Sequence, residues 1–258
     1  MMNIISCINQ KGGVGKSSSS ISIAFGVARE LPLKKVILVD LDSQCNTTQA
    51  LNINFDNVNY TIHDVLIKGV NIKDALYQLT DNVYVVCGSP NMAHCDMELT
   101  EVGKEYKLKE CLQSLEGFAD YLILDNPPAL NTITINSMTA SNYVLIPCQA
   151  DVFSLDAMTK LNDTINTIRT YTNPGLKILG VLLTRYSKRS VLTRQIQEVI
   201  DETAKAMGTK VYGTIREAIA LKESQAVKQD IFTYNSRCGV AKDYMQIVKE
   251  IINEIEKR

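Results

Sequence analysis

Short apolar segments rich in β-branched residues alternate along the chain with longer segments whose apolar residues recur at helical spacing. The short segments are residues 4–8, 36–39, 83–86, 121–124, 143–146 and 178–183. Most of them are apolar at every position, which is typical of parallel strands buried between two helical layers. The expected helices are residues 16–30, 104–115, 132–140, 155–171, 192–207 and 240–256.

This alternation predicts an α/β fold, namely a doubly wound, mostly parallel sheet flanked by helices on both faces. The sequence contains no internal repeat, low-complexity tract or Gly/Ser/Pro-rich linker. We therefore expect residues 1–258 to form a single domain. Because ligands of open α/β sheets bind at the carboxyl ends of the strands, polar residues that follow strands are the candidate functional residues.

Charge and cysteine content narrow the possible functions. The net charge of -1 excludes a globally basic nucleic-acid coat protein, although a local basic patch remains possible. The seven cysteines are odd in number and contain no C-x-x-C pair, so we expect small core residues in a reducing compartment. The two histidines, His63 and His94, are isolated and do not indicate a zinc site.

Targeting segments are not evident in the sequence. The apolar stretch near the N-terminus is too short for a signal peptide, and no apolar run approaches the length of a membrane span. We therefore expect a cytoplasmic protein that does not enter a membrane.

A glycine-rich segment, QKGGVGKSS at residues 10–18, joins the first expected strand to the first expected helix. Its glycines allow backbone N–H groups to face phosphate oxygens, and the helix directs its positive end to the same place. Lys16 would neutralise the β- and γ-phosphates, and the Ser17 hydroxyl would bind Mg²⁺. The alternatives are a plain tight turn for the glycines and a solvated surface lysine for Lys11. Lys16 and Ser17 in register favour the phosphate loop.

The segment from Lys11 to Ser17 resembles the deviant Walker A motif, K-G-G-x-G-K-[ST], of the ParA/MinD family of P-loop ATPases. The ordinary motif has glycine where this chain has Gln10. The resemblance implies ATP or ADP with Mg²⁺ as cofactors and ATP hydrolysis that depends on Lys11 and Lys16. The implied nucleotide contacts are Lys11, Gly12, Gly13, Val14, Gly15, Lys16, Ser17 and Ser18. In this family the first lysine, here Lys11, reaches the nucleotide of a second subunit, which implies an ATP-dependent homodimer.

The segment VDLDSQCN at residues 39–46 is similar to the D-x-D-P-Q-G-N switch segment of the same family. Ser43 and Cys45 stand where the family has proline and glycine. The resemblance implies that Asp40 orients the attacking water and that Asp42 lies near Mg²⁺. For Asp42, capping of the following helix is an equally open interpretation.

The segment YLILDNPP at residues 121–128 resembles the Walker B segment of the family. Asp125 would lie in the outer shell of Mg²⁺, so the implied metal-site residues are Ser17, Asp42 and Asp125. Turn formation alone is the alternative for an aspartate followed by two prolines. Three motifs in order, each at a strand end, favour the functional interpretation. Farther along, the resemblance implies adenine contacts from Thr184, Ile215, Arg216 and Glu217.

Several members of the family have requirements that this sequence does not meet. Iron–sulfur members need cysteines at the dimer interface, and related tyrosine kinases end in a tyrosine cluster. A membrane-binding member of the MinD type should end in a basic amphipathic helix. Here residues 240–256 carry an apolar stripe, and acidic residues are at least as frequent as basic ones on the other face. We expect this helix to pack against the sheet.

Residues 185–194, RYSKRSVLTR, carry four positive charges and no negative charge. The segment resembles the one that supplies non-specific DNA contacts in ParA proteins, with the contacts implied for Arg185, Lys188, Arg189 and Arg194. A solvated surface loop is the alternative.

The resemblance as a whole implies a partitioning ATPase for a plasmid or chromosome. Its dimer would bind DNA, associate with the nucleoid and be released when a ParB-like partner stimulates hydrolysis. The alternatives are a MinD-like positioning ATPase with a membrane or protein cargo, and an ATP-dependent ligase or synthase. The motifs show no acid-binding pocket for the last. Because the phosphate loop begins so early, we expect no preceding DNA-recognition domain.

Overall fold

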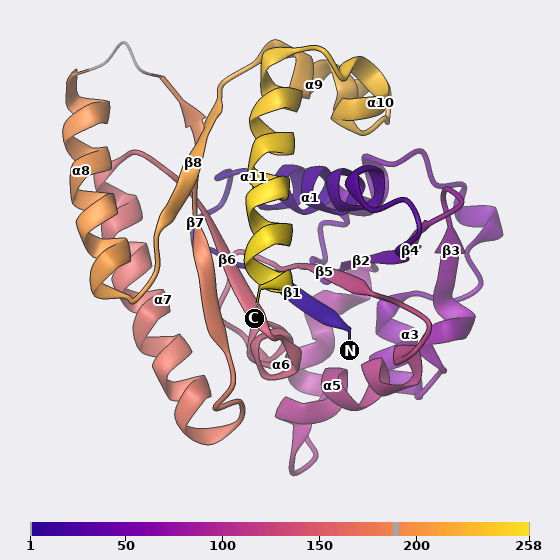
Figure 1. The fold of residues 1–258 in the computed structure, drawn as a ribbon. Coiled ribbons are helices and arrows are strands. Elements are labelled where there is room, and N and C mark those ends of the chain that lie inside the picture. The colour runs from indigo at the N-terminus through magenta and orange to yellow at the C-terminus, as the bar shows by residue number, and fades with distance from the viewer. Residues whose placement is uncertain (1, 188–190, 258) are drawn as a thin grey trace.

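The computed structural model describes residues 2–187 and 191–257 of the chain, and these form one mixed sheet covered by helices (Figure 1). The strands are β1 (Asn3–Cys7), β2 (Val36–Asp40), β3 (Leu76–Gln78), β4 (Val83–Val86), β5 (Tyr121–Asp125), β6 (Tyr143–Gln149), β7 (Lys177–Tyr186) and β8 (Val211–Arg216). Their order in the sheet is β3-β4-β2-β5-β1-β6-β7-β8. The pair β3–β4 is antiparallel, and the other neighbouring pairs are parallel.

Helices cover both faces of this sheet (Figure 1). They are α1 (Lys16–Glu30), α2 (Asn46–Gln49), α3 (Ile62–Lys68), α4 (Cys95–Glu98), α5 (Lys107–Leu112), α6 (Thr132–Ala140), α7 (Val152–Tyr171), α8 (Val191–Ala206), α9 (Ile219–Ala226), α10 (Ile231–Asn235) and α11 (Gly239–Glu256). One core forms between the sheet and α1, α10 and α11. On the other face, α3 to α6 build a second core and α6 to α8 a third. The predicted doubly wound α/β fold is confirmed.

The burial of individual elements explains why the apolar pattern located them. Strands β2 and β5 are buried at every position, as expected for central strands with helices on both sides. Helix α11 buries the apolar stripe identified in the sequence, including Tyr244, Val248 and Ile251. It packs closely on α1, because a Cβ atom added to Gly26 would lie 2.6 Å from Cγ2 of Val248. The expectation that the C-terminal helix packs against the body of the fold is therefore confirmed.

Several elements differ from the sequence-based expectation. Strands β3 and β8 and helices α2, α3, α4, α9 and α10 were not predicted, because they are short or lie at the edges of the fold. The expected helix at residues 104–115 is divided into the 3₁₀ turn Lys104–Tyr106, α5 and the 3₁₀ turn Gln113–Leu115. Strands β6 and β7 run beyond their apolar cores, because parallel pairing continues to Gln149 and Thr184.

The cysteines are free thiols, and five of the seven are buried. This agrees with their expected place in the core. In the part of the chain that the structure describes, no helix combines the length and the hydropathy needed to cross a bilayer.

Candidate functional site

The carboxyl ends of β1, β2 and β5 meet at one edge of the sheet. The parallel register places Asp125 opposite Cys7 on one side and opposite Asp40 on the other. The segment from residue 8 to residue 15 leaves β1 at this edge and leads directly into α1. The three motifs found in the sequence are therefore brought together by the strand order.

The segment before α1 has the backbone geometry of an anion-binding loop. Gly13 and Gly15 have positive φ angles of 75° and 84°, which glycine adopts without strain. Gly15 is the N-cap of α1, no side chain caps the helix, and its first turn has no acidic residue. The amino end of α1 therefore offers uncapped N–H groups and a positive partial charge to an anion.

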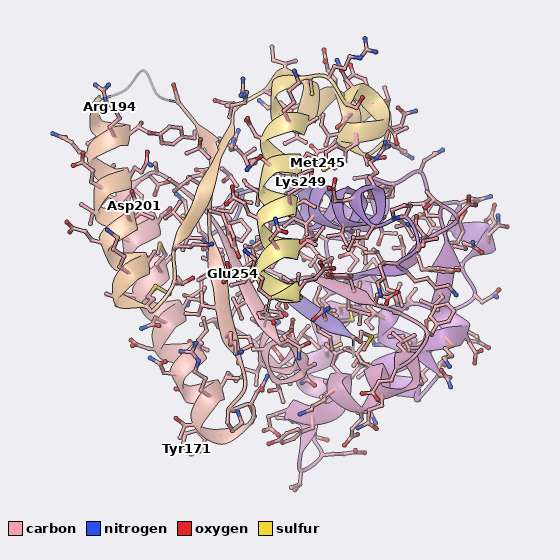
Figure 2. The ribbon with its side chains drawn as sticks, in the orientation of Figure 1. Tyr171, Arg194, Asp201, Met245, Lys249 and Glu254 are labelled. Atoms are coloured by element: carbon pink, nitrogen blue, oxygen red, sulfur yellow. The ribbon has the colours of Figure 1, made fainter. Side chains whose placement is uncertain are left out.

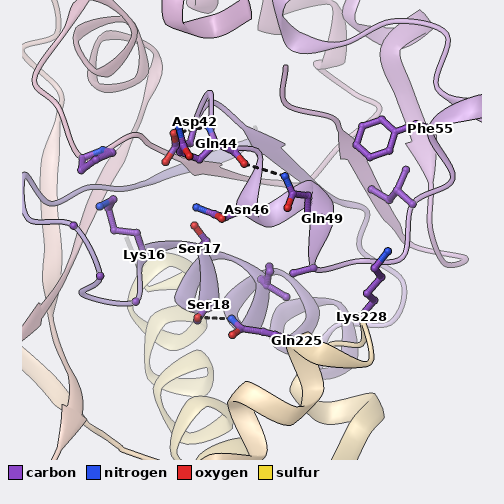
Figure 3. Close-up of a pocket in the computed structure, with 17 residues that line it drawn as sticks. Lys16, Ser17, Ser18, Asp42, Gln44, Asn46, Gln49, Phe55, Gln225 and Lys228 are labelled. Atoms are coloured by element: carbon purple, nitrogen blue, oxygen red, sulfur yellow. Dashed lines mark hydrogen bonds between the residues drawn. The ribbon is translucent and has the colours of Figure 1, made fainter. Parts of the chain in front are cut away.

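A cavity of about 740 Å³ opens in front of this loop (Figure 3). Lys16, Ser17 and Ser18 line one side, and Asp42, Gln44 and Asn46 lie on the facing side. Lys16 is 7% exposed, and its Nζ donates a hydrogen bond to the carbonyl oxygen of Lys11 at 3.1 Å. Burial lowers the pKa of Lys16, against the attraction of Asp125 and Asp42. An anion in the cavity would stabilise this buried ammonium.

The three candidate carboxylates differ in their access to the cavity. Asp42 lines it, and its Oδ1 accepts a hydrogen bond from the Gln44 N–H at 3.0 Å. Asp40 and Asp125 are fully buried and do not line it. Asp125 accepts hydrogen bonds from the hydroxyls of Thr47 at 2.7 Å and Ser20 at 3.1 Å. Burial raises the pKa of Asp125, and hydrogen bonds from Thr47, Ser17 and Ser20 oppose this shift.

Asp40 is enclosed by the segment that follows it. Its Oδ2 accepts hydrogen bonds from the Thr48 N–H at 2.9 Å and the Thr48 hydroxyl at 2.7 Å. The same hydroxyl accepts a hydrogen bond from the Gly88 N–H at 2.9 Å. Burial, and then the nearby charge of Asp125, raise the pKa of Asp40 to about 7. The geometry thus gives Asp40 structural partners and no direct access to the cavity.

Lys11 is not among the residues that line the cavity, and its side chain contacts the start of α7 instead. Its Nζ forms an ion pair with Asp151 at 2.5 Å and lies 5.7 Å from the centre of the Phe153 ring. Asp151 is also the N-cap of α7, where Oδ1 accepts a hydrogen bond from the Ser154 N–H at 3.0 Å. Lys11 is therefore held at the start of α7 of the same chain.

Comparisons with known proteins identify this arrangement. Residues 2–178 match the protein family described as "AAA domain". The sporulation initiation inhibitor protein Soj of Bacillus subtilis is 34% identical over 97% of this chain and 98% of its own length. The chromosome-partitioning ATPase Soj of Treponema pallidum is 32% identical over 95% of each chain. The chain belongs to the ParA/MinD family of ATPases. The crystal structure of cobyrinic acid a,c-diamide synthase from Mycobacterium smegmatis with bound ATP analog and magnesium has a similar fold, with a TM-score of 0.86 and 26% identity, over 99% of this chain and 96% of that one.

This ParA/MinD-type ATPase has a second cavity of about 220 Å³ beside the first. It is lined by the four residues expected to contact adenine, Thr184, Ile215, Arg216 and Glu217. The two cavities share Gly13, Gly15, Ser18 and Gln225, and the Gln225 side chain donates a hydrogen bond to the Ser18 hydroxyl at 2.8 Å (Figure 3).

Two of the lining side chains also have structural partners. The Thr184 hydroxyl lies 2.7 Å from the Val14 carbonyl oxygen and 3.0 Å from that of Cys148, so it holds the phosphate loop against β6. Arg216 forms two hydrogen bonds of 2.7 Å with the Asp243 carboxylate.

The structure describes part of the expected DNA-contact segment. Arg185 has a positive φ of 50° and pairs with Glu217 at 3.5 Å. Arg194 is exposed near the amino end of α8 (Figure 2). Lys188 and Arg189 lie outside the described residues.

Several residues of the site were missed by sequence reasoning. Thr47 and Thr48 follow the switch motif directly, so hydroxyls at these positions were a detectable pattern. Asp151 begins a helix with a serine three residues later, which is a recognisable cap. Its pairing with Lys11 depends on the fold, and so does the position of Gln225.

Proposed function

We propose that this ATPase is a ParA-type partitioning protein that binds Mg·ATP, dimerises around it, and binds DNA until hydrolysis releases it. The observation that carries the proposal is the convergence of an uncapped helix end, the buried Lys16 ammonium and the Asp42 carboxylate on one cavity. The similarity to two Soj proteins over nearly the whole chain supports the partitioning role. The unbroken sheet supports a single domain spanning residues 1–258.

The nucleotide would occupy both cavities. Its phosphates would lie against residues 12–18 at the amino end of α1, and its adenine would enter the cavity between Ile215 and Leu221. The Ser17 hydroxyl, which lines the first cavity, would bind Mg²⁺, while the buried Asp125 would act on the outer shell by orienting Ser17. The bound Mg²⁺ would neutralise charge on the β- and γ-phosphates. Oxygen donors of this kind suit Mg²⁺.

The geometry favours a different division of labour between Asp40 and Asp42 from the one expected from the sequence. Asp42 lines the cavity and can contact a water or the hydrated metal, whereas Asp40 is fully buried against Thr48. We therefore assign the orientation of the attacking water to Asp42. Asp40 would position the segment that carries Asp42, since its Oδ1 accepts a hydrogen bond from the Asp42 N–H at 3.2 Å.

The dimer would require Lys11 to leave Asp151. In the described subunit Lys11 is held in cis, so its contact with the nucleotide of a second subunit exchanges one anionic partner for another. ATP would favour the dimer because its γ-phosphate supplies that second partner, and hydrolysis would remove it.

Two variants test the nucleotide site. Lys16→Ala should abolish nucleotide binding, because it removes the buried ammonium from the phosphate loop. Asp42→Ala should retain ATP and accumulate the dimer, because the γ-phosphate is no longer lost. Isothermal titration calorimetry and light scattering measure the two properties, and Asp156→Ala, an exposed change on α7, is the control. An Asp42→Ala protein that binds ATP and stays monomeric would contradict the cycle.

DNA binding would come from the exposed cations of the segment that includes Arg194. ATP-dependent binding to random-sequence DNA should weaken with salt by about 0.9 log units per log[salt] for each phosphate neutralised. Arg194→Ala should lower this slope, while Lys205→Ala near the far end of α8 should not. A ParB-like partner should raise the ATPase rate only when DNA is present. A slope unchanged in Arg194→Ala would remove this residue from the interface.

A further inference from the structure

A cluster of three different metal-binding side chains lies outside the nucleotide site. His63 is on α3, and Cys95 and Glu98 are on α4. One potential ligand atom from each lies within 4.8 Å of the other two. His63 Nε2 and Glu98 Oε2 are 2.8 Å apart. We propose that His63, Cys95 and Glu98 bind one Zn²⁺ ion.

The donor set fits the chemistry of zinc. An imidazole nitrogen, a thiolate and a carboxylate oxygen are the three donors that proteins offer to Zn²⁺, at bond lengths of about 2.0–2.3 Å. In a tetrahedral site with such bonds, ligand atoms lie about 3.3–3.7 Å apart. The 2.8 Å separation is shorter than this and the 4.8 Å limit is longer, so small side-chain rotations bring the donors into range. Three protein ligands leave the fourth position to water.

Two of the proposed ligands are buried, and the third is exposed to solvent, so an ion can enter the site from the side of the third. Cys95 is fully buried, and His63 is 6% exposed. The Thr61–Asp64 capping box fixes the first turn of α3, and with it the backbone of His63. The Glu98 side chain is 38% exposed, so an ion can reach the other two ligands from its side. The nearby sulfur of Met92, 3.6 Å from Cys95 Sγ, adds a buried apolar wall.

The simplest competing explanation is that the cluster is only a His63–Glu98 ion pair beside a core cysteine. That explanation predicts no metal affinity, so metal binding separates the two. The site is distinct from the Mg²⁺ site, which has oxygen donors and no thiolate. Cobalt(II) is a suitable probe, because a cobalt–thiolate bond produces a charge-transfer absorption that oxygen ligands do not.

The full chain, dialysed against a chelator and free of nucleotide, should bind one cobalt(II) per chain with a thiolate charge-transfer band, and Zn²⁺ should displace it. Cys95→Ser and His63→Gln should each remove the band. Each should weaken Zn²⁺ binding by more than the roughly 10- to 100-fold that loss of an outer-shell partner costs. Because the Glu98 side chain is exposed, Glu98→Gln should fold even if the two buried variants do not. It should weaken Zn²⁺ binding to a similar extent.

The chain provides matched controls. Cys111 lies on α5 and is only partly buried, and His94 directly precedes Cys95 but is exposed. Cys111→Ser and His94→Gln should therefore keep the band and the zinc affinity. A wild-type chain without the band would overturn the proposal, as would a band that survives Cys95→Ser. Equal losses in the control variants would also overturn it.

Discussion

The Lys11–Asp151 ion pair should oppose dimerisation, and Asp151→Asn should remove this opposition. Asparagine is as good an N-cap as aspartate, so the hydrogen bond to the Ser154 N–H and the start of α7 should be preserved. Only the negative charge that holds Lys11 is lost. The substitution therefore separates the ion pair from the structural role of the same side chain.

The size of the expected change in the dimer constant follows from how exposed the ion pair is and from how many ion pairs each dimer releases. The two side chains are 30% and 32% exposed, so the pair contributes about 0.5–1 kcal/mol per subunit. Two subunits release two such pairs on dimerisation, which totals about 1–2 kcal/mol. The ATP-dependent dimer of Asp151→Asn should then be about 5- to 30-fold tighter than that of the unsubstituted protein.

Sedimentation equilibrium with ATP measures this difference, with Asp42→Ala present in both proteins to block turnover. The matched control is Asp156→Asn, which removes an exposed ion pair with Lys160 on the same helix. It should leave the dimer constant unchanged. Asp151→Ala should tighten the dimer and also lose about 1 kcal/mol of stability with the cap. Equal dimer constants for Asp151→Asn and its parent would refute the reasoning.

Two further predictions concern the stability of the fold. Gly26→Ala should lower the free energy of unfolding by about 1–3 kcal/mol, because the new methyl group would overlap Val248. Urea titration measures this change. Gly175→Ala is the control, because its Cβ atom has room, and it should not lower the free energy of unfolding. Because the folded-state pKa of Asp40 is raised from 3.8 to about 7, the folded protein keeps a proton that the unfolded chain releases, and the Tm should fall as the pH rises through this window. Asp40→Asn should flatten that part of the Tm profile, and parallel profiles would show that Asp40 does not titrate in this range.

The central strands and helices could be predicted because the apolar pattern that specifies each of them lies within its own short segment of sequence. Strands β2 and β5 are apolar throughout, and α1 matches its expected bounds of residues 16–30. The strand ends also indicated Asp42, which lines the cavity, and Asp125, which is buried at the same edge of the sheet. Strand β8 escaped notice because it is an edge strand, with Gly213 and partly exposed positions that interrupt its apolar pattern.

The sequence could not show how deeply each side chain is buried, or which residues that are distant in the sequence contact one another. Asp40 and Asp42 look alike in the sequence, yet the fold encloses Asp40 completely and leaves Asp42, which is 7% exposed, on the cavity wall. The ion pair between Lys11 and Asp151 joins residues 140 positions apart. His63 seemed isolated for the same reason, since the approach of α3 to α4 is a tertiary contact.

The hydrogen bonds that link Gly88, Thr48 and Asp40 connect the residues after β4 to α2 and to the start of the switch segment. If Thr48 moved away alone, the Gly88 N–H would lose its hydrogen bond and Asp40 would keep only the one from the Asp42 N–H, and an unsatisfied buried N–H costs about 1–3 kcal/mol. Small displacements are therefore suppressed, and the switch segment should change position as a unit with the end of β4. A nucleotide-driven rearrangement of this segment would then reach the residues after β4 through the Thr48 side chain.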